Sequence, residues 1–183
     1  MRFAPRELGV LLLVAEFGLA LDKSNRGTLP ELLWGCHPAA ILLAIGVIFR
    51  VLLLAQMGSL FHISVGILGY AIDLATTRTT TIPSLIVHIL GPVTGFIQIR
   101  RGGLRPSALI LAIGYYFVLV VLCRLFTPPD LNVNVVFSPY LSREFYEQYP
   151  MLLPIMNAIQ MIGLLGGGYF VLTRTIARPR EVG

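Results

Sequence analysis

Apolar residues run along the chain in long stretches separated by short polar connections. A helix needs about 20 mostly apolar residues to cross the hydrocarbon core of a membrane. Turns are predicted at Arg50 and at the segment RRGGLRP, residues 100–106, because a charge in mid-membrane is costly and Gly and Pro interrupt helices. The pattern therefore predicts an all-α polytopic membrane helix bundle with about six transmembrane helices, at residues 6–21, 31–49, 52–74, 82–99, 104–126 and 150–173.

Basic residues are distributed unequally between the two sides of this predicted bundle. With six spans both termini share a side, which then holds nine arginines: Arg2, Arg6, Arg50, Arg100, Arg101, Arg105, Arg174, Arg178 and Arg180. The other side holds five basic residues: Lys23, Arg26, Arg78, Arg124 and Arg143. The positive-inside rule therefore predicts a multi-pass inner-membrane protein with both termini in the cytoplasm. Residues 1–183 form a single bundle in this interpretation, and residues 127–149 form an extracytoplasmic loop over it.

Composition supports this class. Hydrophobic residues make up 56% of the 183 positions and charged residues 13%, whereas about 25% of a soluble domain is charged. The net charge of +5 does not indicate a nucleic-acid partner, since no basic cluster is interleaved with aromatic residues. The first residues resemble a signal peptide, but Glu16 interrupts the apolar run and no small-x-small site follows, so we expect a retained first helix.

Two histidines are predicted to reach similar depth in the membrane. His37 lies six or seven residues into the second span and His88 six residues into the fourth, counted from the outer side. At 1.5 Å per residue both lie roughly 10 Å below the outer surface. His62 is predicted to lie deeper, in the third span. An ionisable group inside a membrane indicates function by default, although a histidine that only forms structural hydrogen bonds is the alternative.

The long outer loop carries polar side chains near the same place. Its segment LNVNVVFSPY, residues 131–140, alternates polar and apolar positions. Asn132 and Asn134 point the same way if the segment is extended. Directed inward, they would lie over the mouth where His37 and His88 converge. The loop is otherwise an ordinary lid over the bundle.

The order of these pieces resembles the ether-phospholipid (plasmalogen) acyltransferase family of polytopic membrane proteins, which includes bacterial integral membrane members. The resemblance covers about residues 34 to 160. It is carried by His37-Pro38, Val87-His88, Arg105-Pro106, the segment NVNVVFSP at residues 132–139, and Phe145-Tyr146.

This resemblance implies transfer of a fatty acyl group between phospholipids through a cysteine thiolate that a histidine activates, without a cofactor or a metal. It places His88 at the general base, with His37 as an orienting or oxyanion partner. Asn132, Asn134 and Asp73 are the candidate substrate-binding residues. Either water or a lyso-lipid would accept the acyl group, so the enzyme would be a lipid ester hydrolase or an acyltransferase.

The chain departs from the family at the nucleophile. The family places its cysteine directly after His-Pro, where this chain has Ala39. Cys36 lies three residues earlier, on a neighbouring part of the same helical face. Ser138 occupies a family cysteine position in the outer loop and is the second candidate. The third alternative is that the chemistry has been lost.

Two other functions fit the same residues. His37 and His88 could ligate haem or a metal from adjacent spans. Alternatively the chain is a non-catalytic accessory subunit or a small transporter, which would form an oligomer of itself or assemble with a partner membrane subunit. The membrane phospholipid is the partner that the first hypothesis requires.

Overall fold

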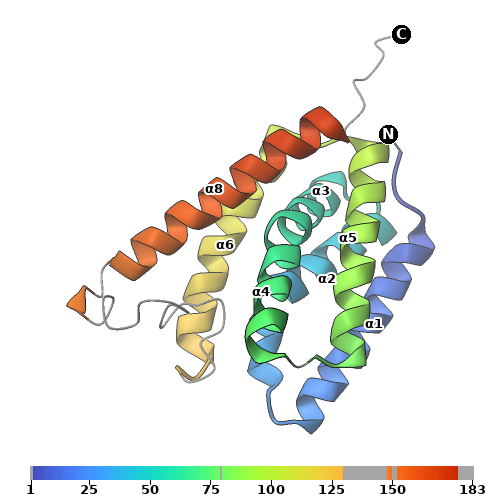
Figure 1. The fold of residues 1–183 in the computed structure, drawn as a ribbon. Coiled ribbons are helices and arrows are strands. Elements are labelled where there is room, and N and C mark those ends of the chain that lie inside the picture. Colours follow the sequence, from blue (N-terminus) through green and yellow to red (C-terminus); the bar gives the residue numbers. More distant parts are fainter. Residues whose placement is uncertain (1, 79, 130–147, 150–151, 177–183) are drawn as a thin grey trace.

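The computed structural model describes residues 2–78, 80–129, 148–149 and 152–176, and all the regular structure in them is helical. Figure 1 shows the arrangement. In chain order the elements are α1 (Arg6–Asn25), the 3-10 helix η1 (Leu29–Leu33), α2 (Cys36–Ile48), α3 (Leu52–Phe61), the π-helix η2 (His62–Gly66), α4 (Ile67–Thr77), α5 (Ile82–Gly102), α6 (Pro106–Phe126) and α8 (Leu152–Thr175). The prediction of an all-helical fold is confirmed for the described residues.

Four helices are long and apolar enough to cross a membrane: Leu52–Ala75, Ile82–Gly102, Pro106–Phe126 and Leu152–Thr175. The first of these joins α3, η2 and α4 without a break. The four coincide with the predicted third to sixth spans, as expected for a membrane helix bundle. The predicted first span lies within α1, a helix of 20 residues that also contains charged side chains.

The predicted second span is not one continuous helix. The chain forms η1, becomes extended at Trp34 (φ −54°, ψ 128°), and only then begins α2. Gly35 lies directly at the interruption, and glycine is a poor residue for a helix interior. Pro38 is tolerated because it lies in the first turn of α2. The 13 residues of α2 extend about 20 Å, less than the roughly 30 Å of a hydrocarbon core, so the expectation of a full helix over 31–49 is wrong.

Small residues bring α2 and α3 into close contact. A Cβ on Gly46 would lie 2.7 Å from the Cα of Ala55, and a Cβ on Gly58 would lie 2.6 Å from the carbonyl oxygen of Ala39. Only glycine permits such an approach between two backbones, as is typical of membrane helix pairs. α1 and α5 pack against this pair, and Leu12, Leu43 and Leu60 are completely buried between the helices.

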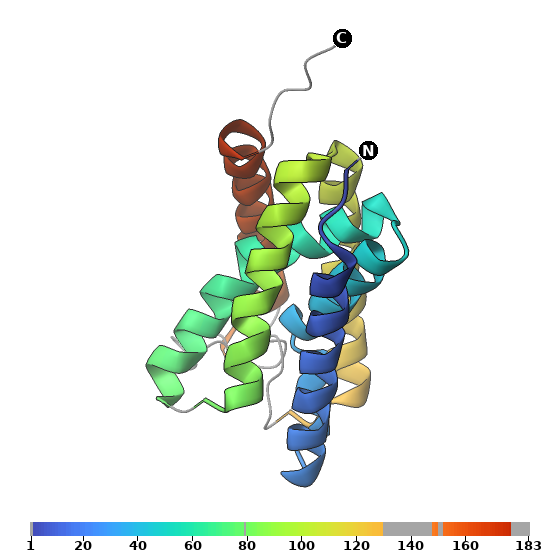
Figure 2. The same ribbon diagram turned by 90° about the vertical axis from the view of Figure 1, so that its right-hand side faces the viewer.

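α6 and α8 cover one flank of the bundle, where they contact each other and α3 (Figures 1 and 2). Their outward faces expose large apolar side chains: Ile110, Val118, Val121 and Leu125 on α6, and Ile155, Ile159, Phe170 and Val171 on α8. An apolar surface of this extent indicates contact with lipid or with another chain.

The bundle has two distinct ends. At one end the N-terminal segment is tied to α5, because the amide of Ala4 donates to Oε1 of Gln98 at 2.9 Å. The turn between α2 and α3 and the end of α8 lie at this end too (Figure 1). At the other end Lys23 pairs with Glu31, and the α4–α5 connection lies nearby. Side chains from segments that lie at the same end of the bundle can therefore contact each other.

Candidate functional site

Three histidines from three helical elements lie side by side in the bundle. His37 is on α2, His62 begins η2, and His88 is on α5. The ring centroids of His37 and His88 are 5.5 Å apart in an edge-to-face arrangement. The centroids of His62 and His88 are 5.8 Å apart with the rings nearly parallel. The structure therefore brings together the two histidines expected from the sequence and adds a third, His62, which was expected to lie deeper.

The π-helix explains how His62 reaches the cluster. The amide of Ile67 donates to the carbonyl of His62, a bond across five residues. A π-helical turn holds one more residue than an α-helical turn, and such turns occur often at functional sites. The opposing helix makes room with Gly91, where a Cβ would overlap the His62 ring. In the sequence, the only indication of this contact is that one span contains His62 and the next contains Gly91.

Gly91→Ala is expected to destabilise the protein by about 1–3 kcal/mol, the usual cost of overpacking a core, because the added methyl group meets the buried His62 ring. Gly69→Ala is the matched control, since a Cβ on Gly69 meets nothing within 4 Å. Alanine there should stabilise the helix by up to about 1 kcal/mol. Thermal unfolding in detergent measures both variants, and equal melting temperatures would contradict the contact.

Hydrogen bonds fix the tautomers of two of the rings. Nδ1 of His88 donates to the carbonyl of Ser84 at 2.8 Å, and Nδ1 of His62 donates to the carbonyl of Cys36 at 3.2 Å. A carbonyl oxygen only accepts, so each Nδ1 carries the hydrogen and each neutral ring keeps a lone pair on Nε2. His88 therefore has the form that a general base requires.

Glu16 lies behind His37. Its side chain is 4% exposed, and Oε1 lies 3.4 Å from Nδ1 of His37. A carboxylate in this position orients an imidazole and stabilises its protonated form. The other oxygen, Oε2, is buried without a hydrogen-bond partner among the described residues. Glu16 thus links α1 to the histidine cluster.

Cys36 is the first residue of α2, and its carbonyl accepts from Nδ1 of His62 at 3.2 Å, which places it beside the cluster. Ala39, at the nucleophile position of the resembled family, is completely buried against α3. A side chain at position 39 therefore faces the packed core, while the side chain at position 36 is partly exposed. The second cysteine, Cys123, is buried elsewhere and donates to the carbonyl of Leu33.

Tyr70 and Asp73 border the cluster on α4. The ring of Tyr70 stacks on His88, with centroids 3.8 Å apart, and its hydroxyl is 2.6 Å from Oγ1 of Thr80. Asp73 lies nearly one turn further along α4, within electrostatic range of Lys23, Glu31 and His88. Asp73 was predicted from the sequence, but Tyr70 was not, because its contact with His88 depends on the three-dimensional path of α4 and α5.

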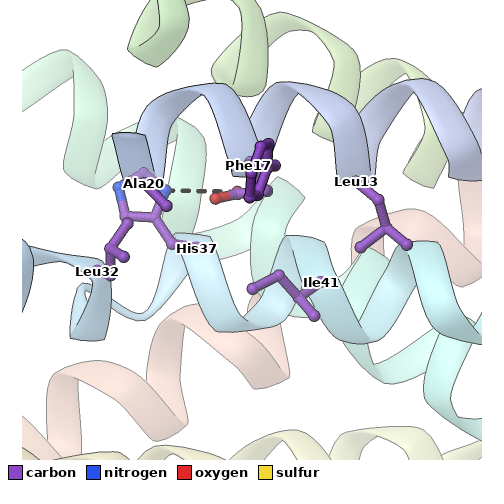
Figure 3. A pocket seen from close by; sticks show the side chains of 7 residues that line it. Leu13, Phe17, Ala20, Leu32, His37 and Ile41 are labelled. Atoms are coloured by element: carbon purple, nitrogen blue, oxygen red, sulfur yellow. Dashed lines mark hydrogen bonds and ion pairs between the residues drawn. The ribbon is translucent and has the colours of Figure 1, made fainter. Parts of the chain in front are cut away.

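A cleft of about 330 Å³ opens between α1 and α2 (Figure 3). Glu16 and His37 both line it, and the dashed line in Figure 3 marks the contact between them. The rest of the lining is apolar: Leu13, Phe17, Ala20, Leu32 and Ile41. An apolar cleft that contains a carboxylate–imidazole pair suits a ligand with a hydrocarbon chain and a polar group.

The remaining candidate residues, Ser138, Asn132 and Asn134, lie outside the part of the chain that the structure describes. Within that part, no group of three or more His, Cys, Asp or Glu side chains is arranged to hold a metal ion. The direct contact between His37 and His88 leaves no slot for a porphyrin between their rings.

Comparison with known proteins gives no relative, since no family model, no curated protein and no solved structure matches the chain. The function must therefore be argued from the geometry of the site.

Proposed function

We propose that the protein is a membrane enzyme that transfers or hydrolyses acyl chains of phospholipids, the chemistry that its resemblance to the ether-phospholipid acyltransferases implies. One observation carries the proposal. Cys36, the first residue of α2, lies beside the histidine cluster, because its carbonyl accepts from Nδ1 of His62 at 3.2 Å. In that cluster Nε2 of His88 holds a lone pair, and Glu16 orients His37. Nucleophile, base and orienting carboxylate are thus together, as nucleophilic catalysis requires.

The reaction would proceed in two steps through a thioester. Nε2 of His88 removes the proton of the Cys36 thiol, and the sulfur attacks the ester carbonyl of the phospholipid. The ester C–O bond breaks, the lyso-lipid leaves as an alcohol with the proton from His88, and the acyl group remains on sulfur. Water or the hydroxyl of a second lyso-lipid then loses a proton to His88 and attacks the thioester, which restores the thiol.

The helix start supports the ionic steps. The aligned peptide dipoles of a helix give its start about half a positive charge, although in α2 the amides of His37 and Ala39 already donate to the carbonyls of Trp34 and Gly35. An anion beside this helix start is stabilised by the dipole, whether it is the thiolate of Cys36 or the oxyanion of the tetrahedral intermediate. The interruption before α2 is therefore useful, because a continuous helix would have no such end inside the membrane.

The proposed topology places this site at the depth of a lipid ester. In this topology the chain crosses the inner membrane six times, and both termini lie in the cytoplasm. α2 is a short span. Its C-terminal end lies at the cytoplasmic face, and its first residue, Cys36, lies inside the membrane. Because α2 extends about 20 Å of a core of roughly 30 Å, Cys36 lies about 10 Å below the outer surface. The cleft beside Glu16 and His37 would hold the acyl chain.

The outer-loop residues complete the proposal. Asn132 and Asn134 would bind the phospholipid from above the cluster, and Asp73 would do so from the end of α4. Ser138 stays the alternative nucleophile, with Cys36 preferred because the histidines lie beside it.

Capture of the thioester tests the proposal. Purified protein in nanodiscs is incubated with a phospholipid that carries an isotopically labelled acyl chain, and peptides are then analysed by mass spectrometry. We expect the label on Cys36, in a form that neutral hydroxylamine removes, together with release of lyso-lipid. A hydroxylamine-resistant label on Ser138 would assign the alternative nucleophile. If lyso-lipid forms and neither residue is labelled, the covalent mechanism is wrong; without lyso-lipid, the proposed activity is wrong.

A further inference from the structure

A second pocket lies at the end of the bundle remote from the histidine cluster. It has a volume of about 480 Å³ and is lined by Arg2, Phe3, Arg50 and Arg101. These residues come from three separate parts of the chain: the N-terminal segment, the turn between α2 and α3, and the last turn of α5. Three arginines thus line one cavity, although the sequence separates them widely.

Backbone contacts hold the pocket together. Nη1 of Arg101 donates to the carbonyl of Phe3 at 3.2 Å, and the buried bond from Ala4 to Gln98 anchors the next residue. Gly102 permits this approach, because a Cβ there would lie 3.2 Å from the carbonyl oxygen of Arg2. The N-terminal segment is therefore fixed against α5, and the arginines do not depend on a loose tail for their positions.

Arg50 adopts an unfavourable backbone conformation to reach the pocket. Its φ of 58° is in the left-handed region, where glycine is the favoured residue and other side chains are disfavoured. Its guanidinium lies 5.6 Å from the centroid of the Phe3 ring. A glycine would make the same turn between α2 and α3 without strain, so the turn alone does not explain an arginine at this position.

The three arginines have no acidic partner within the described residues, where the ion pairs are Lys23–Glu31, Arg26–Asp22 and His37–Glu16. Three positive charges around one cavity repel each other unless an anion binds between them. Guanidinium groups bind phosphate oxygens in a bidentate geometry that the ammonium group of lysine cannot reproduce.

We propose that this pocket binds a phosphate group, carried by an anionic lipid headgroup or by a soluble phosphate compound. The site is distinct from the proposed catalytic cluster and does not depend on the proposed enzymatic activity. In the six-span topology it faces the cytoplasm, where anionic headgroups and soluble phosphates are both present.

Binding measurements on paired arginine variants test this site. The probes are inorganic phosphate, dihexanoyl phosphatidic acid and, as a zwitterionic control, dihexanoyl phosphatidylcholine, added to the full-length protein in a non-ionic detergent. Arg50→Gly is expected to raise the dissociation constant for the phosphatidic acid at least tenfold, and Arg101→Gln to raise it similarly. Both sources of phosphate are compatible with the site: binding of inorganic phosphate alone identifies a soluble ligand, and binding of the phosphatidic acid alone identifies a lipid.

Arg78→Gly is the matched control, since Arg78 has nearly the same backbone conformation, φ 54°, at the other end of the bundle. Both glycine variants remove backbone strain, so neither should lower the melting temperature, and a loss of binding in Arg50→Gly cannot come from unfolding. Unchanged affinity in Arg50→Gly, an equal loss in Arg78→Gly, or equal affinity for phosphatidylcholine would each overturn the proposal. Retention of phosphate binding in Cys36→Ala would show that this site stands apart from the catalytic one.

Discussion

Replacing Cys36 by alanine is expected to reduce phospholipid acyl exchange to the uncatalysed level. Removal of a catalytic nucleophile costs on the order of 10⁴–10⁶ in rate, because the thioester can form only on the sulfur of Cys36. The side chain of Cys36 is partly exposed at the start of α2, so alanine leaves no large cavity and the melting temperature should change little. Acyl exchange on labelled phospholipid in nanodiscs measures the rate, and thermal unfolding checks the fold.

Cys123→Ala is the control for this experiment. Cys123 is completely buried on α6, and its thiol donates to the carbonyl of Leu33. Its replacement should leave the acyl-exchange rate within a few-fold of wild type. If Cys36→Ala kept the wild-type rate, Cys36 would be excluded as the nucleophile. Ser138 would then be the remaining candidate.

The convergence of His37 and His88 could be predicted by counting residues along the helices. A helix rises by a constant amount per residue, so residues equally far from the starts of two helices that begin at the same side reach the same level. The structure places the two rings 5.5 Å apart. That the two residues share a level follows from topology, but that their side chains face each other depends on how α2 and α5 are rotated in the bundle.

His62 could not be located in this way. Counting along a regular α-helix assumes the same rotation for every residue, but η2 inserts a π-helical turn at His62. The inserted residue changes the direction of every later side chain on that span, including Tyr70. The stacking of Tyr70 on His88 therefore depends on a local irregularity that hydrophobic periodicity does not reveal.

The start of α2 was the other feature that periodicity missed. The mostly apolar stretch from residue 31 to residue 49 favours one long helix, yet the chain is extended at Trp34 and begins the helix at Cys36. This break makes Cys36 a helix-terminal residue, next to the positive end of the helix dipole. The position after His-Pro, Ala39, is by contrast fully buried. The nucleophile position that the resemblance implies is therefore not the accessible one in this structure.

Replacing His88 by glutamine is expected to lower the acyl-exchange rate by about 10²–10⁴-fold, the usual contribution of a general base. Glutamine has a similar length but cannot take up a proton from the thiol. Because Nδ1 of His88 donates to the carbonyl of Ser84, the lost function belongs to Nε2. Initial rates measured over a range of concentrations of labelled phospholipid report this effect as a fall in kcat with little change in KM.

Two further measurements separate a catalytic role of His88 from a structural one. First, added imidazole should partly restore exchange in His88→Ala, because the deletion leaves space beside Tyr70 that a small base can occupy. Second, Tyr70→Phe keeps the ring that stacks on His88 and removes only the hydroxyl near Thr80, so its rate should stay within a few-fold of wild type. Unchanged exchange in His88→Gln would remove His88 from the mechanism, and the proton of Cys36 would then have to pass to His37, whose Nδ1 faces the buried carboxylate of Glu16.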